Sequence, residues 1–265
     1  MTNQSYRDRV AIITGSGSGI GKATALALAQ EGMKIVLCGR TVSKLEETAK
    51  LVEEAGGKAL IVSGDLRDES YIIRIVDETM EAFGRIDVLI NNAGVSLAKP
   101  VVDCTAEEFD QIMDTNMKAP FLLCKYSIPH MRKSDCGTII NIASVAAFQP
   151  IPYINVYGAT KAFVLSFSRA LNRELRRQGV GVMAVCPFWT KTAFFDRAVT
   201  GGEAIVKKYA AMYDPDDIVR RTWRDAKRGR DVCKYGFVAR GQAALTKLLP
   251  HSLVMDVWMK QQQLS

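Results

Sequence analysis

The sequence has few of the residues from which metal sites and disulfide frameworks are built. It contains two histidines, His130 and His251, and neither stands in ligand spacing with a cysteine or with the other histidine. Its six cysteines are scattered, and no two of them form a Cys-x-x-Cys pair. This usage argues against a zinc motif and a disulfide-rich fold, and it is typical of reduced thiols in the cytosol. We therefore expect no metal ion and a cytoplasmic location.

Long apolar runs are missing as well. No stretch of about 18 apolar residues occurs, and the first ten residues lack the apolar segment of a signal peptide. The sequence therefore predicts no membrane span. With 265 residues, of which 48% are hydrophobic and 24% charged, the chain has the composition of a soluble globular protein with an ample core.

The charge is unbalanced toward the basic side. The net charge is +7, and residues 201–265 hold 12 Lys and Arg against 7 Asp and Glu. Such an excess is compatible with nucleic acid, a membrane surface or an anionic small molecule as partner. Because the basic residues alternate with acids at helical spacing, we interpret them as a solvated face and expect no nucleic-acid partner.

Strand and helix signals alternate through the first two thirds of the chain. This alternation predicts right-handed βαβ crossovers and a doubly wound α/β fold with a parallel sheet. Neither a linker rich in Ser, Pro or Gly nor an internal repeat interrupts it, so we expect residues 1–265 to form one domain. Pro120 falls within a long predicted helix over 105–131 and predicts a kink or a local rearrangement there. The expected strands cover 9–15, 34–39, 58–63, 86–91, 137–142 and 180–186.

The pattern loosens after Pro187. A loop of about 188–213 mixes aromatic residues with a short helical run, and a helix follows with Asp214 as its N-cap and Pro215 in its first turn. Residues 232–236 are expected to form a final short strand. The apolar tail, about 237–265, is broken by Pro250 and is expected to form a substrate lid or an oligomer contact; peripheral attachment to a membrane surface is a further alternative.

A glycine-rich turn connects the first strand to the first helix. A helix start offers unpaired N–H groups and a positive dipole end, which suit a pyrophosphate. The G-x-G-x-x-G pattern fails because Ile20 stands where it requires glycine, and a Walker A loop does not fit either. The pattern that remains is T-G-x-x-x-G-x-G over residues 14–21, for which a purely structural turn is the alternative.

Tyr157 and Lys161 are four residues apart, with Ser144 thirteen residues before the tyrosine. On a helix, residues i and i+4 share one face, so the phenol and the amine can occupy one small volume. A free tyrosine has a pKa of about 10, and a nearby cation favours its phenolate form. The pattern predicts a proton-transfer site, whereas a surface helix with a chance Tyr-x-x-x-Lys is the alternative.

Five features in order connect these residues to a known family: TGSGSGIG at 14–21, NNAG at 91–94, Asn116, Ser144 and Tyr157-x-x-x-Lys161. Together they resemble the short-chain dehydrogenase/reductase family over roughly residues 8–192. The resemblance implies a Rossmann-type sheet of about seven parallel strands with helices on both faces. It also implies a homodimer or homotetramer that binds a nicotinamide dinucleotide.

The resemblance implies a role for each matching residue. Tyr157 would be the general acid/base, Lys161 would lower its pKa and hold the nicotinamide ribose, and Ser144 would orient the reacting oxygen. Asn116 would hold a water that connects Lys161 to solvent. Besides Tyr157 and Lys161, the implied cofactor contacts are Gly15, Ser16, Ser18, Gly19, Ile20, Gly21, Asp65, Leu66, Asn92, Ala93, Gly94, Pro187, Thr190 and Thr192.

The end of the second strand favours NADP(H) over NAD(H). In Rossmann units an acidic residue at this place accepts hydrogen bonds from the adenosine ribose and repels a 2′-phosphate. Here the strand ends without an acid, and Arg40 offers a planar cation to a phosphate. An ordinary exposed arginine is the alternative interpretation.

The substrate region departs from the family pattern, because Phe188 follows Pro187 where the family usually has glycine. The bulky ring of Phe188 either changes the local backbone path and the shape of the pocket or supplies an apolar wall. The aromatic lining favours a bulky, weakly polar alcohol or ketone, with core packing as the alternative. The expected lining residues, besides Ser144 and Tyr157, are Phe148, Pro150, Tyr153, Phe188, Trp189, Phe194 and Phe195.

Three functions are compatible with these residues. The favoured one is NADP(H)-dependent oxidation or reduction of a hydroxysteroid or bile acid, for which the late basic excess would suit an anionic side chain. The first alternative is a 3-oxoacyl (β-ketoacyl) thioester reductase. The second is a non-catalytic NADP sensor or scaffold, which the presence of Asn116, Ser144, Tyr157 and Lys161 disfavours.

Overall fold

The computed structural model describes residues 6–134, 136–194, 205–209 and 211–264. Seven strands form one parallel sheet in the order β3-β2-β1-β4-β5-β6-β7. The strands are β1 (Val10–Thr14), β2 (Lys34–Gly39), β3 (Lys58–Ser63), β4 (Val88–Asn91), β5 (Thr138–Ile142), β6 (Gly181–Cys186) and β7 (Val232–Lys234). The predicted doubly wound α/β fold is confirmed.

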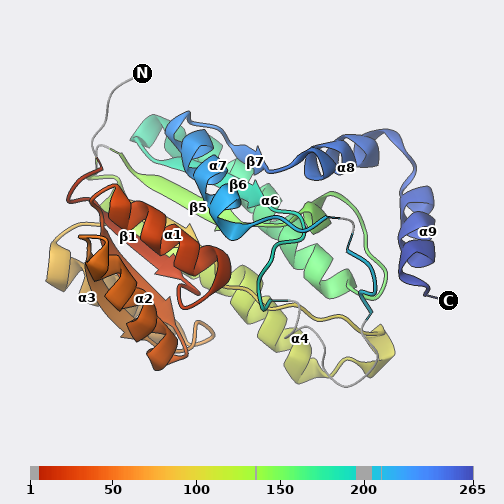
Figure 1. Cartoon of the computed structure of the whole chain (residues 1–265), viewed down its shortest axis with the longest axis horizontal. Coiled ribbons are helices and arrows are strands. Elements are labelled where there is room, and N and C mark those ends of the chain that lie inside the picture. The colour runs from red at the N-terminus through yellow and green to blue at the C-terminus, as the bar shows by residue number, and fades with distance from the viewer. Residues whose placement is uncertain (1–5, 135, 195–204, 210, 265) are drawn as a thin grey trace.

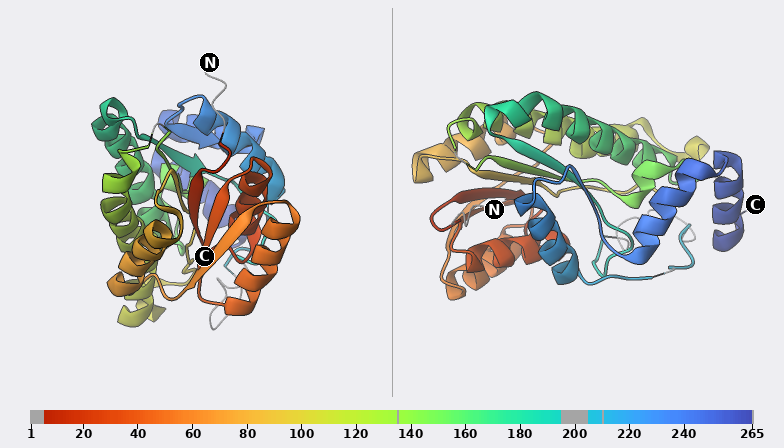
Figure 2. Two further views of the ribbon diagram at one scale, coloured as in Figure 1. Left: turned by 90° about the vertical axis from the view of Figure 1, so that its left-hand side faces the viewer. Right: turned by 90° about the horizontal axis from the view of Figure 1, so that it is seen from above.

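Helices cover both faces of the sheet (Figures 1 and 2). On one face α1 (Gly19–Gln30), α2 (Val42–Glu54) and α7 (Pro215–Lys227) pack on alternate side chains of the central strands. On the other face α3 (Glu69–Phe83), α5 (Ala119–Met131) and α6 (Asn155–Leu175) do the same. All five residues of β1 are buried, because a central strand of a parallel sheet has no solvent side.

The long helix expected over 105–131 is interrupted. The chain forms α4 (Ala106–Met113), a π-helical turn (Asp114–Lys118) and then α5, in whose first turn Pro120 lies. Proline is tolerated there because the first N–H groups of a helix have no partner within it. The expected local rearrangement is confirmed, and it begins before the proline.

The C-terminal tail forms α8 (Phe237–Leu248) and α9 (His251–Gln262), separated at Pro250. Figure 1 and the right panel of Figure 2 show both helices at one end of the molecule. Asp214 caps α7 through a hydrogen bond that its side chain accepts from the N–H of Asp216, as expected. Within the described part of the chain, no helix is both long and apolar enough to cross a bilayer.

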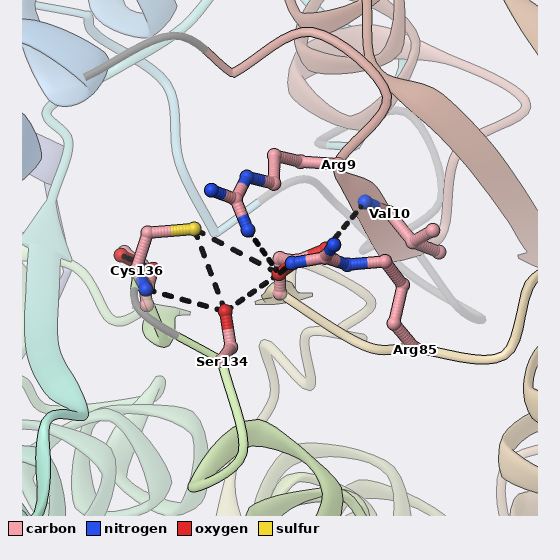
Figure 3. Close-up of polar contacts among 7 residues, drawn as sticks. Arg9, Val10, Arg85, Ser134 and Cys136 are labelled. Carbon is pink, nitrogen blue, oxygen red and sulfur yellow. Dashed lines mark hydrogen bonds and ion pairs between the residues drawn. The ribbon is translucent and has the colours of Figure 1, made fainter.

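The amino end of the sheet is held by a buried carboxylate. Asp87, which immediately precedes β4, accepts hydrogen bonds from the N–H of Val10 (2.9 Å) and from the Ser134 hydroxyl (2.6 Å). Arg85 adds two charged hydrogen bonds, of 2.7 and 2.6 Å, and Arg9 lies at 3.6 Å (Figure 3). These contacts join β1, β4 and the segment before β5, at the edge opposite the candidate site.

Candidate active site

A cavity of about 600 Å³ opens along the carboxyl ends of the strands. In parallel α/β sheets this edge is where ligands bind, because the loops after successive strands meet there. The glycine-rich turn and the ends of β2 and β3 form one half, and the segments after β5 and β6 form the other. Helices α8 and α9 also contribute to its wall.

The glycine-rich turn is shaped to bring backbone close to a ligand. Gly15 and Gly19 have positive φ angles of 64° and 55°, which favour glycine. A Cβ on Gly21 would lie 2.3 Å from the carbonyl oxygen of Gly15, so only glycine fits there. Ser18 is the N-cap of α1 but makes no side-chain cap, and together with Gly19 and Ile20 it lines the cavity.

Two residues expected to contact the cofactor do not line the cavity. Ser16 is fully buried, and its hydroxyl donates to the carbonyl oxygen of Cys38 at 3.3 Å. Gly21 lies beneath the turn against Gly15. The prediction of direct contact was wrong for both, because these residues hold the turn in place and the turn itself faces the cavity.

Tyr157, Lys161 and Ser144 meet at the cavity wall. Tyr157 and Lys161 stand one turn apart on α6, with the lysine Nζ 5.6 Å from the centroid of the phenol ring. The same Nζ donates to the carbonyl oxygen of Ile142 at 2.9 Å. Ser144 follows β5, accepts a hydrogen bond from the N–H of Ala146 (3.1 Å) and is hydrogen-bonded to Tyr157. The structure thus brings the three predicted residues together.

The electrostatics of this trio differ from the expectation. Burial raises the pKa of Tyr157 to about 12, although the hydrogen bond with Ser144 opposes the rise. Burial lowers the pKa of Lys161 to about 8. In the protein alone the lysine therefore does not bring the phenol toward ionisation, since desolvation dominates both groups. Tyr157 is protonated at neutral pH, which suits a proton donor.

Asn116 lies in the π-helical turn and does not itself line the cavity. Its side chain accepts from the N–H of Val95 (2.9 Å) and donates to the Val95 carbonyl (2.9 Å) and to the Thr160 hydroxyl (3.1 Å). A Cβ on Gly94 would lie 3.3 Å from Asn116 Oδ1 and 3.4 Å from Lys161 Nζ. Asn116 therefore joins the loop after β4 to α6 beside the lysine.

The predicted cofactor half of the cavity contains charged side chains at its outer end. Arg40 and Lys44 are both exposed and line this half of the cavity. Lys44 lies in the first turn of α2 and was not predicted from the sequence. Asp65 also lines this half, and the side-chain hydrogen bond with Arg67 holds the pKa of Asp65 below its usual value. The other predicted residues found in this wall are Leu66, Asn92, Ala93, Gly94, Pro187, Thr190 and Thr192.

Two of these residues also support the glycine-rich turn. The Asn92 amide donates to the carbonyl oxygens of Thr14 (2.9 Å) and Gly15 (3.2 Å). A Cβ on Gly19 would lie 2.9 Å from Cγ2 of Thr192, so the segment after β6 closes directly onto the turn. The residues present therefore fit a dinucleotide, since they provide a glycine-rich backbone turn, a helix start without a side-chain cap and cations at one end.

Phe188 packs among aromatic side chains in the cavity wall. Its ring lines the cavity and contacts the rings of Trp189 and Tyr213, with centroids 6.0 and 6.4 Å away. The segment is fixed by backbone hydrogen bonds from Tyr213 to Trp189 (2.8 Å) and from Lys191 to Tyr213 (2.9 Å). Phe188 is thus an apolar wall residue, one of the two outcomes considered from the sequence.

Of the other expected substrate residues, some line the cavity and others do not. Phe194 lines the cavity, with its ring centroid 6.0 Å from that of Tyr157, whereas Phe195 lies outside the described residues. Phe148 packs against the cluster that contains Ala143, and neither Phe148 nor Tyr153 is among the described residues of the cavity wall. The predicted substrate contacts of these two residues are therefore not found in the described wall.

Several of the wall residues that were not predicted from the sequence come from the tail. Helix α8 contributes Gln242 and Leu245, and α9 contributes Val257 and Trp258. Apolar residues at helical spacing on both sides of Pro250 were the available signal, but they did not show which face the helices would turn inward.

Comparison with known proteins agrees with this geometry. Residues 9–201 match the short chain dehydrogenase family. An uncharacterized oxidoreductase of Thermotoga maritima is 34% identical over 216 residues, which cover 82% of this chain and 81% of that protein.

Two solved structures share both the fold and part of the sequence. A short-chain dehydrogenase from Sphingobium yanoikuyae in complex with NADPH has a TM-score of 0.78 and 31% identity, covering 94% of this chain and 96% of that one. The 3-ketoacyl-(acyl-carrier-protein) reductase from Brucella melitensis, complexed with NADH, has a TM-score of 0.74 and 29% identity, covering 84% and 92%. The chain is therefore an oxidoreductase that belongs to the short-chain dehydrogenase family.

Proposed function

We propose that the protein interconverts a secondary alcohol and a ketone by hydride transfer with NADP(H). The observation that carries the proposal is the meeting of Tyr157, Ser144 and Lys161 at one wall of a cavity whose other half is a cradle of backbone and cations. When bound, the reduced nicotinamide supplies a hydride to the carbonyl carbon.

The side chains would carry out the accompanying proton transfer. Ser144 would hold the carbonyl oxygen by a hydrogen bond, and the Tyr157 hydroxyl would donate its proton to that oxygen as the C=O π bond breaks. Its pKa of about 12 keeps that proton on the phenol until charge develops on the substrate. Lys161 would hold the cofactor ribose, and Asn116 would hold a water through which a proton returns from solvent to Lys161 and Tyr157.

Arg40 and Lys44 support the choice of NADP(H). Both are exposed cations at the cavity end where the adenosine ribose would lie, and the Asp65 carboxylate is paired with Arg67 through a 2.8 Å contact. No acidic residue stands at the end of β2 to repel a 2′-phosphate. The relative with bound NADPH agrees with this choice, and the relative with bound NADH makes a direct test necessary.

For the substrate we propose a bulky, weakly polar ketone of the hydroxysteroid or bile-acid type. The support is the apolar wall formed by Phe188, Phe194 and Trp258 beside Tyr157. A 3-oxoacyl thioester is the second candidate, and the Brucella melitensis reductase is the observation that favours it. The association into homodimers or homotetramers that the family resemblance implies stays a prediction, which light scattering would test.

The test is a screen of NADPH oxidation with hydroxysteroid ketones and a 3-oxoacyl thioester, run in parallel with Tyr157→Phe. We expect turnover by the wild type and a loss of about 100-fold or more in the variant, because removal of a general acid has such effects. NADPH affinity should be nearly unchanged. NADPH binding without turnover of any ketone would favour the non-catalytic sensor, and full activity of the variant would overturn the role of Tyr157.

A further inference from the structure

The two halves of the cavity differ in their chemistry. Among the described residues, the charged side chains in its wall are Arg40, Lys44 and Asp65 in the proposed cofactor half and Lys161 beside Tyr157. Beyond Tyr157 lies a region that we call the distal chamber, walled by Ile151, Ile154, Leu245, Val254, Val257 and Trp258. The polar groups that the described residues add to this part of the wall are amides and a hydroxyl, which carry no charge.

The distal chamber is attached directly to the segment that carries Tyr157. Trp258 packs in one apolar cluster with Ile151 and Ile154, and the phenol ring of Tyr157 packs against that cluster. Its indole N–H donates to the carbonyl oxygen of Pro152 at 3.2 Å. A group bound in the chamber would therefore continue from a reacting carbon held at Tyr157.

Helix α8 closes the chamber through an amide pair. The Gln242 amide donates to Gln149 Oε1 at 3.0 Å, which joins α8 to the segment after Ser144, and both residues line the cavity. The pair keeps free N–H groups that can donate to a polar group, but it supplies no positive charge to a carboxylate.

The basic residues of the tail, and Lys234 in β7, do not line this space. The Arg240 guanidinium lies over the ring of Phe237, 5.0 Å from its centroid, and Lys234 lies 5.6 Å from the centroid of Phe148. Lys247 and Lys260 are exposed, and none of these four residues is in the cavity wall. Among the described residues a carboxylate in the chamber would find no cation to compensate for the hydration that it loses, which is unfavourable.

We propose that the distal chamber is a binding subsite for an uncharged, elongated apolar group of the substrate. The inference rests on the proposed function for the position of the reacting carbon. It narrows the substrate to neutral ketones and alcohols and argues against a bile-acid carboxylate in this space.

Calorimetric titration of the full chain saturated with NADP⁺ tests the subsite without turnover, because the oxidised cofactor has no hydride to give to a ketone. The ligands are methyl butyl, methyl hexyl and methyl octyl ketone, and an analogue of the last with a terminal carboxylate in place of the terminal methyl. We expect affinity to rise about fourfold with each added methylene, as burial of an apolar chain predicts. The carboxylate analogue should bind at least about tenfold more weakly than methyl octyl ketone.

A charge introduced into the chamber supplies the matched test. Gln242→Lys should strengthen binding of the carboxylate analogue at least about tenfold relative to methyl octyl ketone, since it provides the missing partner. Leu248→Lys is the control, because Leu248 lies on the same helix, is 81% exposed and is not in the cavity wall. It should leave both affinities unchanged.

Affinity that does not depend on chain length, or equal binding of the carboxylate analogue by the wild type, would overturn the subsite. Equal changes in ligand affinity in Gln242→Lys and Leu248→Lys would also overturn it. Failure of the proposed function has a different signature, because the neutral ketones would then bind with the expected chain-length dependence but never be reduced by NADPH.

Discussion

Lys161 is an amine placed where its charge is poorly solvated. It is 4% exposed, and burial lowers its pKa to about 8, whereas an unfolded lysine has a pKa of about 10.4. Below pH 8 the folded protein holds a buried charge and is destabilised by it. Between pH 8 and about pH 10.4, the unfolded chain keeps the lysine proton that the folded protein has released. The free energy of unfolding therefore rises with pH in this range. Burial of the Lys161 amine thus lowers the stability of the folded protein and places a cation beside the phenol.

Lys161→Met should therefore stabilise the protein without cofactor while abolishing turnover. Each kcal/mol gained raises the melting temperature by about 2–4 °C, and loss of the hydrogen bond to Ile142 offsets about 1 kcal/mol. Thermal unfolding of variant and wild type at pH 7 and pH 10 checks this, because the gain should be largest at the lower pH. A gain that is equal at both values would contradict the burial of a charge.

Arg40→Asp should reverse the cofactor preference. A carboxylate would repel the 2′-phosphate and accept hydrogen bonds from the ribose hydroxyl, so the ratio of NADPH to NADH affinity should fall at least about tenfold. Titration of each cofactor measures the ratio. Arg173→Asp is the control, since Arg173 is exposed on α6 outside the cavity wall. An unchanged ratio in the Arg40 variant would show that this residue does not recognise the phosphate.

At the scale of elements, a buried side chain of α9 is hydrogen-bonded to the segment after β6. Gln262 is fully buried, accepts hydrogen bonds from the N–H groups of Lys207 (2.7 Å) and Lys208 (3.0 Å), and donates to the Lys208 carbonyl (3.1 Å). This arrangement lets the tail hold a connecting segment near the cavity, where Val206 is part of the wall.

Gln262→Ala should loosen that segment while leaving the sheet intact. Three hydrogen bonds of about 1 kcal/mol each are lost, so backbone exchange at Lys207 and Lys208 should accelerate at least about tenfold. Hydrogen exchange read by mass spectrometry measures it, with the exposed Lys260→Ala on the same helix as control. Equal protection in both variants would rule out this attachment.

The sequence was most informative where one physical rule acts alone. Strand positions, the N-cap of Asp214 and the meeting of Tyr157 with Lys161 follow from local periodicity and were predicted. The position of the Phe148 side chain, the inward face of α9 and the raised pKa of Tyr157 depend on packing between distant segments. These three features were not predicted. The expectation for Tyr157 counted the cation and left out burial, which is the larger effect in the protein alone.

At the scale of the whole molecule, Asp87 joins the central strands at the edge opposite the candidate site. Burial by itself would raise the pKa of Asp87, but hydrogen bonds from Arg85, Ser134 and Val10 outweigh it and hold the pKa below its usual value. Its ionised form is thus favoured by folding. The stabilisation is present above the ordinary pKa of about 3.9 and is lost as the pH falls through the lower folded value.

Asp87→Ala should cost about 3–5 kcal/mol at pH 7, because it leaves buried donors without their partner. Urea unfolding measures the cost, which should shrink below about pH 4 as the wild-type carboxylate becomes protonated. Asp231→Ala, which removes an exposed pair with Arg169 at 3.4 Å, is the control and should cost less than about 1 kcal/mol. Equal costs would show that the carboxylate does not hold the sheet.

The most direct test of the account follows the hydride itself. NADPH carrying deuterium at the reactive position of the nicotinamide is supplied with a neutral ketone, and the alcohol is analysed by mass spectrometry. We predict one deuterium on the carbinol carbon with the wild type and almost none with Tyr157→Phe at equal NADPH occupancy. An alcohol formed without deuterium, or equal transfer by the variant, would contradict hydride transfer assisted by Tyr157.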